Sequence, residues 1–177
     1  MIKYLFVGLF FINSFVIWEK ADNTTAAKKL TITDRTAALK VHNDARADVG
    51  LPALIWSDDL ATDAAEWAQN MAEKDKMYHS SNDQRPNQGE NLYYTTATDT
   101  EKAGQSAAQA WYNEIHDFTY APIGSGKNNF PAIGHYTQMV WKSTTAVGMA
   151  LAVSKSGATY VVARYSPPGN WQGEKPY

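Results

Sequence analysis

The chain has 177 residues, with 16 Lys and Arg side chains, 18 Asp and Glu side chains and no cysteine. The net charge of −2 argues against a general nucleic-acid-binding protein, which carries a basic excess or stripe. The absence of cysteine excludes disulfides, thiolate metal sites and cysteine nucleophiles, and the length predicts a single domain.

The first residues predict an export signal. Lys3 precedes an apolar run from Tyr4 to Trp18, which is the pattern of a secretory signal peptide. The run of about 15 residues is short for a membrane-spanning helix, which needs about 20. We expect residues 1–21 to be a signal peptide, 22–32 a linker and 33–177 the domain of a secreted, extracellular protein. The alternatives are an apolar start that arose by chance and an uncleaved N-terminal anchor, which is the one membrane attachment that the sequence allows.

The predicted linker contains a sequon for N-glycosylation, Asn23-Thr24-Thr25. Asn23 is therefore a candidate modification site in a host that glycosylates. Sequons also occur frequently by chance, so an unmodified Asn23 is the alternative.

Apolar side chains at helical spacing predict two helices in the first half of the domain. Residues that favour helix caps precede each one, and Gly50 follows the first as a stop signal. The stretch between the two helices is expected to be an apolar connector. The first helix is capped by Thr33 or Asp34 and ends near Val49, the connector is Leu51–Trp56, and the second helix is capped by Ser57 or Asp58 and ends near Lys76.

The second half mixes loops, helices and strands. Two apolar strands are separated by Ser154-Lys155-Ser156-Gly157, a connection that suits a hairpin. Helices combined with an antiparallel hairpin predict an α+β or layered α-β-α domain. The expected order is a loop at 79–89, an extended segment at 90–94, a helix from Thr98 or Asp99 to Asp117, a loop at 119–131, a short helix or turn at 132–141, strands at 146–153 and 159–165, and an irregular tail from Ser166.

Two of the four histidines are interpreted as structural or surface residues. His42 lies within the first predicted helix and is expected to be hydrogen-bonded in the fold. His116 follows Glu114 by two positions, and residues at that spacing point away from each other on a helix. If Glu114 faces a site, His116 therefore faces solvent.

The other two histidines, His79 and His135, lie beside loops. Residue type alone does not distinguish a solvent-exposed histidine from a functional one at these two positions. Glu90 precedes an apolar aromatic run, so its carboxylate is expected to be partly buried and to need a partner.

Five motifs in order resemble the CAP superfamily, which comprises the cysteine-rich secretory proteins, the antigen 5 allergens and the plant pathogenesis-related 1 proteins. The resemblance runs from about residue 34 to residue 177, so that it covers nearly all of the predicted mature chain. The motifs are His42-Asn43-x-x-Arg46, Gly89-Glu90-Asn91, Trp111-Tyr112-x-Glu114, Gly134-His135-Tyr136-Thr137-Gln138-Met139-Val140-Trp141 and Val162-Ala163-Arg164-Tyr165-Ser166-Pro167-Pro168-Gly169-Asn170-Trp171.

The resemblance implies a three-layer α-β-α sandwich with a central antiparallel sheet, and a cleft holding two histidines and two acidic residues. The matching positions are His79, Glu90, Glu114 and His135. Two imidazoles can bind Zn²⁺ or another divalent metal, and carboxylates can orient the rings through their other nitrogens. A hydrogen-bonded His–Glu network without metal is the structural alternative.

For function, the resemblance implies a non-catalytic extracellular binding module of the defence or host-interaction type. Its ligand would be a sterol, a fatty acid or an extracellular protein partner, and Phe118–Pro131 is the candidate wall of the binding groove. The alternative is a metal-dependent hydrolase or protease. In that case zinc on His79 and His135 would polarise water, with Glu90 or Glu114 as general base.

The chain departs from most secreted relatives in having no cysteine, and Ala163 stands where plant relatives have one. Residues 167–177 resemble a signalling peptide that plant pathogenesis-related 1 proteins release. The residues before the cut differ from the family pattern. The alternative to peptide release is a Pro-rich tail that packs Trp171 and Tyr177 on the domain.

Overall fold

The computed structural model describes residues 26–97 and 99–177. The predicted signal peptide at 1–21 and the sequon at Asn23 lie outside the described residues. No helix in the described part of the chain is both long and apolar enough to cross a membrane.

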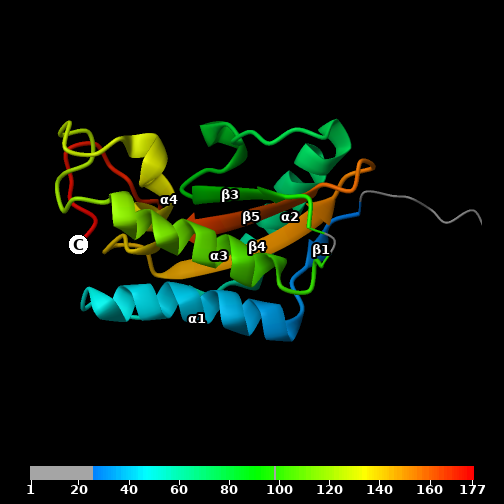
Figure 1. The fold of residues 1–177 in the computed structure, drawn as a ribbon, viewed down its shortest axis with the longest axis horizontal. Coiled ribbons are helices and arrows are strands. Elements are labelled where there is room, and N and C mark those ends of the chain that lie inside the picture. Colours follow the sequence, from blue (N-terminus) through cyan, green and yellow to red (C-terminus); the bar gives the residue numbers. More distant parts are fainter. Residues whose placement is uncertain (1–25, 98) are drawn as a thin grey trace, which may run out of the picture.

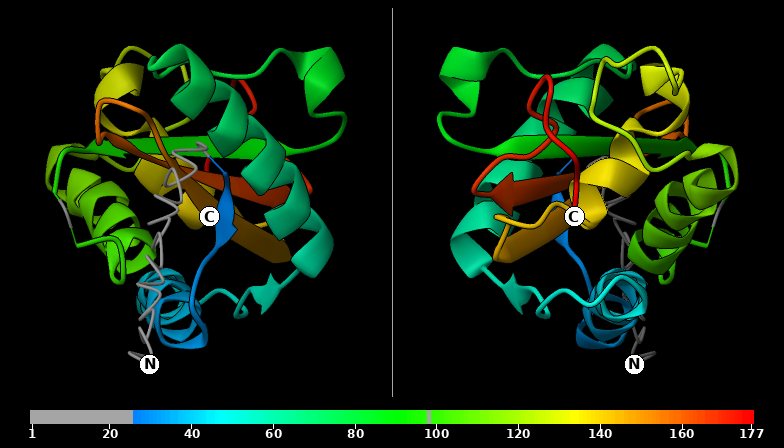
Figure 2. Two further views of the ribbon diagram at one scale, coloured as in Figure 1. Left: turned by 90° about the vertical axis from the view of Figure 1, so that its right-hand side faces the viewer. Right: turned by 90° about the vertical axis from the view of Figure 1, so that its left-hand side faces the viewer.

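The domain is a three-layer α-β-α sandwich, as predicted. Helices α1 (Ile32–Asp48) and α3 (Ala103–Asn113) cover one face of the central sheet, and α2 (Asp58–Lys74) covers the other (Figures 1 and 2). Successive side chains of a strand point to opposite faces. Helices cover both faces of the sheet. For this reason its two central strands, at residues 146–153 and 159–166, are apolar along almost their whole length.

The sheet is built around the predicted hairpin of β4 (Ala146–Val153) and β5 (Thr159–Ser166). The main path through the sheet runs β1 (Lys28–Lys29), β4, β5 and β3, and each neighbouring pair on this path is antiparallel, as predicted. The last strand of this path, β3 (Gly89–Thr95), contains the predicted extended segment. Its register places Glu90 opposite Arg164.

Two very short strands extend the sheet beyond the prediction. Residues Ile55–Trp56 of the predicted connector form β2, which pairs with β4 in parallel. Lys28–Lys29 form β1, which also pairs with β4. Strand β1 and the first residue of α1 therefore lie within the segment 22–32, which the sequence predicts as a linker.

The predicted start of the first helix is wrong, and so is that of the third. The hydroxyl of Thr31 accepts a hydrogen bond from Asp34 N (3.2 Å), so α1 begins at Ile32. Asp34 instead accepts hydrogen bonds from the first amides of α3, those of Gly104 and Gln105 (2.8 Å each). Helix α3 has no side-chain cap of its own, and it starts at Ala103 rather than at residue 98 or 99. The cap comes from a distant segment, which local sequence does not reveal.

The remaining helix boundaries lie close to the predicted ones, except that the third helix ends four residues earlier than Asp117. Ser57 caps α2 as predicted, and the helix ends at Lys74 because Asp75 adopts a left-handed conformation (φ 48°). Helix α3 ends at Asn113 and continues as a 3-10 turn over Glu114–Asp117. The short helix α4 (Gly134–Met139) lies within the predicted 132–141 segment.

Buried Arg46 ties α4 to α1. Its Nη1 donates to the carbonyls of Met139 (3.1 Å) and Trp141 (2.9 Å), and its Nη2 donates to that of Thr144 (3.0 Å). Its Nε donates to the carbonyl of Pro52 (2.7 Å). The carbonyls of residues 139, 141 and 144 lie at and beyond the end of α4. One arginine side chain therefore anchors the end of the helix that carries His135.

Candidate functional site

His79 and His135 line one cavity of about 360 Å³. Glu90, Asn91 and Asn170 contribute to its walls, together with Phe130, Pro131 and Gly134. Glu114 is not part of the wall and contacts the cavity only through His135. The fold therefore brings all four predicted site residues together as two His–Glu pairs.

The first pair joins exposed His79 to a buried carboxylate. The Nδ1 atom of His79 lies 2.7 Å from Glu90 Oε1, and the side chain of Glu90 is 1% exposed. Ser80 donates to both carboxylate oxygens, through its amide (3.0 Å) and its hydroxyl (2.8 Å). Arg164 lies opposite on the neighbouring strand and completes the cluster, with its Nη2 at 3.2 Å from Glu90 Oε2.

These donors keep Glu90 ionised despite its burial. Burial is the largest single influence and favours the neutral acid, but His79, Arg164 and Ser80 together outweigh it. The pKa of Glu90 therefore lies below its ordinary value. An ionised carboxylate with four donors around it is a fixed acceptor, and it holds the ring of His79 in one orientation.

The second pair joins His135 to Glu114. The Nδ1 atom of His135 lies 2.6 Å from Glu114 Oε1. The second oxygen, Oε2, accepts from the amides of His135 (2.9 Å) and Tyr136 (3.0 Å) at the start of α4. Trp111 stacks on the imidazole with its ring centroid 6.0 Å away and an interplanar angle of 25°. The ring of His135 is thus fixed by a carboxylate at one edge and an indole on one face.

The carboxylates determine which ring nitrogen is free. An ionised carboxylate only accepts hydrogen bonds, so Nδ1 carries the hydrogen in each neutral ring. The lone pair is then on Nε2, the nitrogen with which such a histidine ligates a metal. Among residues 26–97 and 99–177, no three His, Cys, Asp or Glu side chains form a group that could hold a metal ion. The arrangement therefore offers two nitrogen ligands and leaves further positions to water or a ligand.

A buried hydrogen-bond network meets the cavity at Asn91 and His135, and the sequence did not predict it. Asn91 donates to the carbonyl of His135 (3.1 Å) and to the hydroxyl of Tyr165 (3.0 Å). The Tyr165 hydroxyl in turn donates to Nε2 of His42 (2.8 Å), whose Nδ1 donates to the carbonyl of Ala38 (2.8 Å). His42, Asn91 and Tyr165 each belong to one of the family motifs, which indicated that they matter. Their contacts join segments far apart in the sequence, so the motifs did not predict which residues meet.

Both other histidines behave as predicted. His42 is fully buried, and burial lowers its pKa to about 4, so it is a neutral structural residue. His116 is exposed and takes no part in the cavity.

The loop Phe118–Pro131 contributes only its end to the cavity, through Phe130 and Pro131. Ala121 and Ile123 of the loop are buried, and Ile123 joins a buried cluster with Ile133 and Trp141, whereas residues 124–127 are exposed. The tail crosses this loop, with hydrogen bonds between Ile123 and residues 173 and 174.

The tail is packed at its end and exposed in its middle. Tyr177 stacks on Tyr120, with ring centroids 4.9 Å apart, and contacts Phe118. Trp171 is 54% exposed, so only one of the two predicted aromatic anchors packs on the domain.

Comparison with known proteins identifies relatives over most of the chain. The sequence profile described as the cysteine-rich secretory protein family, CAP, matches residues 39–165. The chain is 37% identical over 142 residues to pathogenesis-related leaf protein 4 of Solanum lycopersicum, which covers 78% of this chain and 80% of that protein. It is 34% identical over 132 residues to Golgi-associated plant pathogenesis-related protein 1 of Homo sapiens, with coverage of 75% and 81%.

Solved structures share the fold. The crystal structure of NaASP2 with Zn²⁺ superposes with a TM-score of 0.73 at 26% identity, and the match covers 88% of each chain. The structure of BmVAL-1 superposes with a TM-score of 0.71 at 24% identity, and the match covers 84% of this chain and 83% of that one.

Proposed function

The chain belongs to the cysteine-rich secretory protein family, CAP, and we propose that it is a secreted, non-catalytic binding protein whose cleft holds a divalent metal ion. The metal would be Zn²⁺ or a similar ion, held by His79 and His135. The role is of the defence or interaction type. The bound ion would supply a positive, partly open coordination sphere for a ligand or partner group.

One observation carries this proposal: two imidazoles line the same cavity, and each has its Nδ1 hydrogen donated to a carboxylate. Histidine ligands of metals typically have this second partner. Glu90 and Glu114 accept hydrogen bonds on both of their oxygens, so they act as orienting groups rather than as ligands. The crystal structure of NaASP2 with Zn²⁺ supports the choice of metal.

The same carboxylates favour binding over hydrolysis. A general base needs a free lone pair within reach of water and works best with a pKa near neutrality. Glu90 is buried, engaged by its neighbours and lowered in pKa, and Glu114 lies behind His135. Neither matches the general base that a metal-dependent hydrolase requires.

The cavity wall combines polar groups with apolar surface. Its side chains include two imidazoles, a carboxylate and two amides, while Phe130 and Pro131 contribute apolar area, and more of the exposed wall is apolar than polar. Ligand pockets for sterols or fatty acids are lined predominantly by hydrophobic groups. Sterol and fatty-acid binding remains a prediction that rests on the family resemblance, and saturable uptake of a labelled sterol would test it.

The proposal is tested by titrating Zn²⁺ into the purified protein by calorimetry at neutral pH. We expect saturable binding at one site, with an affinity below that of sites with three or four protein ligands. Binding should weaken at acidic pH, because a protonated imidazole cannot ligate.

Matched variants locate the metal. The double variant His79→Ala, His135→Ala should lose the binding, and His116→Ala, which removes an exposed histidine outside the cavity, should retain it. If the parent shows no saturable binding, or the double variant binds like the parent, the proposed metal cleft is wrong.

A further inference from the structure

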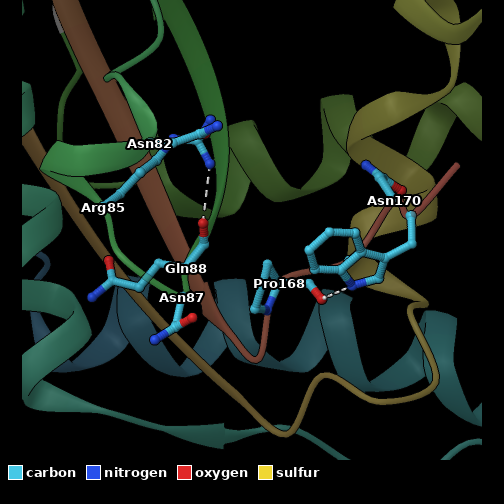
Figure 3. A pocket seen from close by; sticks show the side chains of 8 residues that line it. Asn82, Arg85, Asn87, Gln88, Pro168 and Asn170 are labelled. Atoms are coloured by element: carbon cyan, nitrogen blue, oxygen red, sulfur yellow. Dashed lines mark hydrogen bonds between the residues drawn. The ribbon is translucent and has the colours of Figure 1, made fainter.

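A second pocket lies next to the His–Glu cavity, between residues 82–88 and the tail segment 168–171 (Figure 3). Its volume is about 370 Å³, at the small end of the range of about 300–1,000 Å³ for ligand pockets. Asn170 lines both this pocket and the metal cavity, so the two are contiguous. The polar and aromatic residues of its wall are Asn82, Arg85, Asn87, Gln88, Asn170 and Trp171.

The wall combines one exposed aromatic ring with planar amides. Trp171 is 54% exposed, which makes it the most exposed large aromatic side chain among the described residues. Its indole nitrogen donates to the carbonyl of Pro168 (3.2 Å), which fixes the ring relative to the tail.

The residue before the tryptophan is also anchored. The side chain of Asn170 accepts from the hydroxyl of Thr137 (2.7 Å) and donates to the carbonyl of Gly134 (2.8 Å). Both bonds tie the tail to α4. The aromatic ring of the pocket is therefore presented from a fixed backbone, which lowers the entropy cost of binding.

The opposite wall offers unused hydrogen-bonding groups. No hydrogen bond among the described residues involves the side-chain amides of Asn82 and Asn87, which are both exposed. The guanidinium of Arg85 donates to the backbone carbonyls of Ser80 (3.1 Å) and Gln88 (3.0 Å). In the described part of the chain no carboxylate pairs with it. Each free amide can both donate and accept.

The geometry points to this pocket as a binding subsite for a neutral saccharide. A pyranose ring has an apolar C–H face that packs on an indole, and hydroxyls that donate and accept at its rim. Trp171 matches the face, and Asn82, Asn87 and Arg85 match the rim. A lipid would leave the amides unpaired, at a desolvation cost, and an anion such as phosphate would find a single cationic side chain.

This inference goes beyond the proposed metal cleft and does not depend on it. The test uses the purified protein and titrates it by calorimetry with neutral tetrasaccharides: cellotetraose, laminaritetraose and N-acetylchitotetraose. Tetragalacturonate and adenosine serve as probes of acidic saccharide and nucleoside binding. We expect saturable binding of at least one neutral tetrasaccharide.

Two variants remove separate parts of the pocket. Trp171→Ala removes the stacking face and should weaken binding by about 10-fold or more. Asn87→Gly keeps the left-handed backbone of residue 87 (φ 57°) and removes only the amide, so it should weaken binding by about 3- to 10-fold. Tyr94→Ala removes another exposed aromatic ring, 46% exposed on β3 and outside the pocket, and should leave binding unchanged.

Several outcomes would overturn the inference: no binding of any neutral tetrasaccharide, equal binding by Trp171→Ala and the parent, or binding of tetragalacturonate or adenosine alone. A zinc titration of Trp171→Ala separates the two proposals, because this variant should bind zinc like the parent. Loss of saccharide binding with zinc binding intact in Trp171→Ala supports the saccharide subsite and shows that the metal cleft does not depend on it. In the double variant His79→Ala, His135→Ala, loss of zinc binding with saccharide binding intact would show that the subsite does not depend on the metal.

Discussion

At the scale of single residues, His42 makes both of its hydrogen bonds as a neutral ring. Its Nδ1 donates to the carbonyl of Ala38, and its Nε2 accepts from the hydroxyl of Tyr165. Protonation would place a second hydrogen where Tyr165 now donates, inside a fully buried site. The histidine thus links α1 to β5 only while it is uncharged.

This predicts an acid-sensitive fold. Burial lowers the folded-state pKa of His42 from 6.5 to about 4, so the unfolded chain takes up the proton first as the pH falls. The free energy of unfolding should decrease between about pH 6.5 and pH 4, by at most about 1.4 kcal/mol per pH unit from this group. Urea unfolding of the parent and of His42→Gln at several pH values measures it.

The amide of the variant does not titrate, so its stability should fall less over this window. Glu90 does not explain such a difference, because both proteins contain it and its lowered pKa confines its own loss of stabilisation to the acid end of this window and below. Parallel pH profiles for the parent and the variant would contradict the assignment to His42.

At the scale of elements, α3 depends on a cap supplied by α1. Asp34 accepts from two amides in the first turn of α3, and Gly104 allows the close approach. A Cβ atom added at Gly104 would lie 2.3 Å from Leu30 Cδ1 and 2.9 Å from Asp34 Oδ2. At the contact between the two helices, position 104 must therefore have no side chain and position 34 must carry a carboxylate.

We expect Asp34→Ala to lower the free energy of unfolding by about 1–2 kcal/mol, at the upper part of the range for lost helix caps, because two amides lose their acceptor. Urea unfolding measures the change. The control is Asp44→Ala, which removes an exposed carboxylate of α1 that pairs only with Lys40 and should cost less than about 0.5 kcal/mol. Equal effects of the two substitutions would show that the cap across helices is unimportant.

At the scale of the whole molecule, the His–Glu cavity collects residues from four separate segments. His79 follows α2, Glu90 lies on β3, Glu114 follows α3 and His135 lies on α4. A metal held by the two histidines would therefore join the end of the α2 segment to α4, across the edge of the sheet. Binding to the folded state alone stabilises the whole fold.

The thermal stability of the protein should accordingly increase with zinc. At a free concentration of about 100 times Kd, binding adds about 2.7 kcal/mol, which for a chain of this size raises Tm by about 5–10 °C. Thermal unfolding followed by circular dichroism with and without zinc measures the shift. The double variant His79→Ala, His135→Ala should show none, and an equal shift in both proteins would place the metal elsewhere.

Short-range pattern in the sequence determined the helices, the hairpin and the types of the site residues. The apolar spacing located α2, and the polar connection at 154–157 located the β4–β5 hairpin. The motifs that contain Glu90, Glu114 and His135 indicated the family, and the resemblance then assigned His79 as the fourth site residue. These features depend on neighbours within a few residues, so they can be read directly from the chain.

Only the tertiary structure decided which groups meet. The cap of α3 by Asp34, the clustering of Ser80 and Arg164 around Glu90, and the exposure of Trp171 beside a second pocket all join distant segments. The hydrogen-bond partners of such groups depend on the path of the chain and on the packing of the sheet between its helices. Local sequence spacing carries no record of that path, which is why these contacts were not predicted.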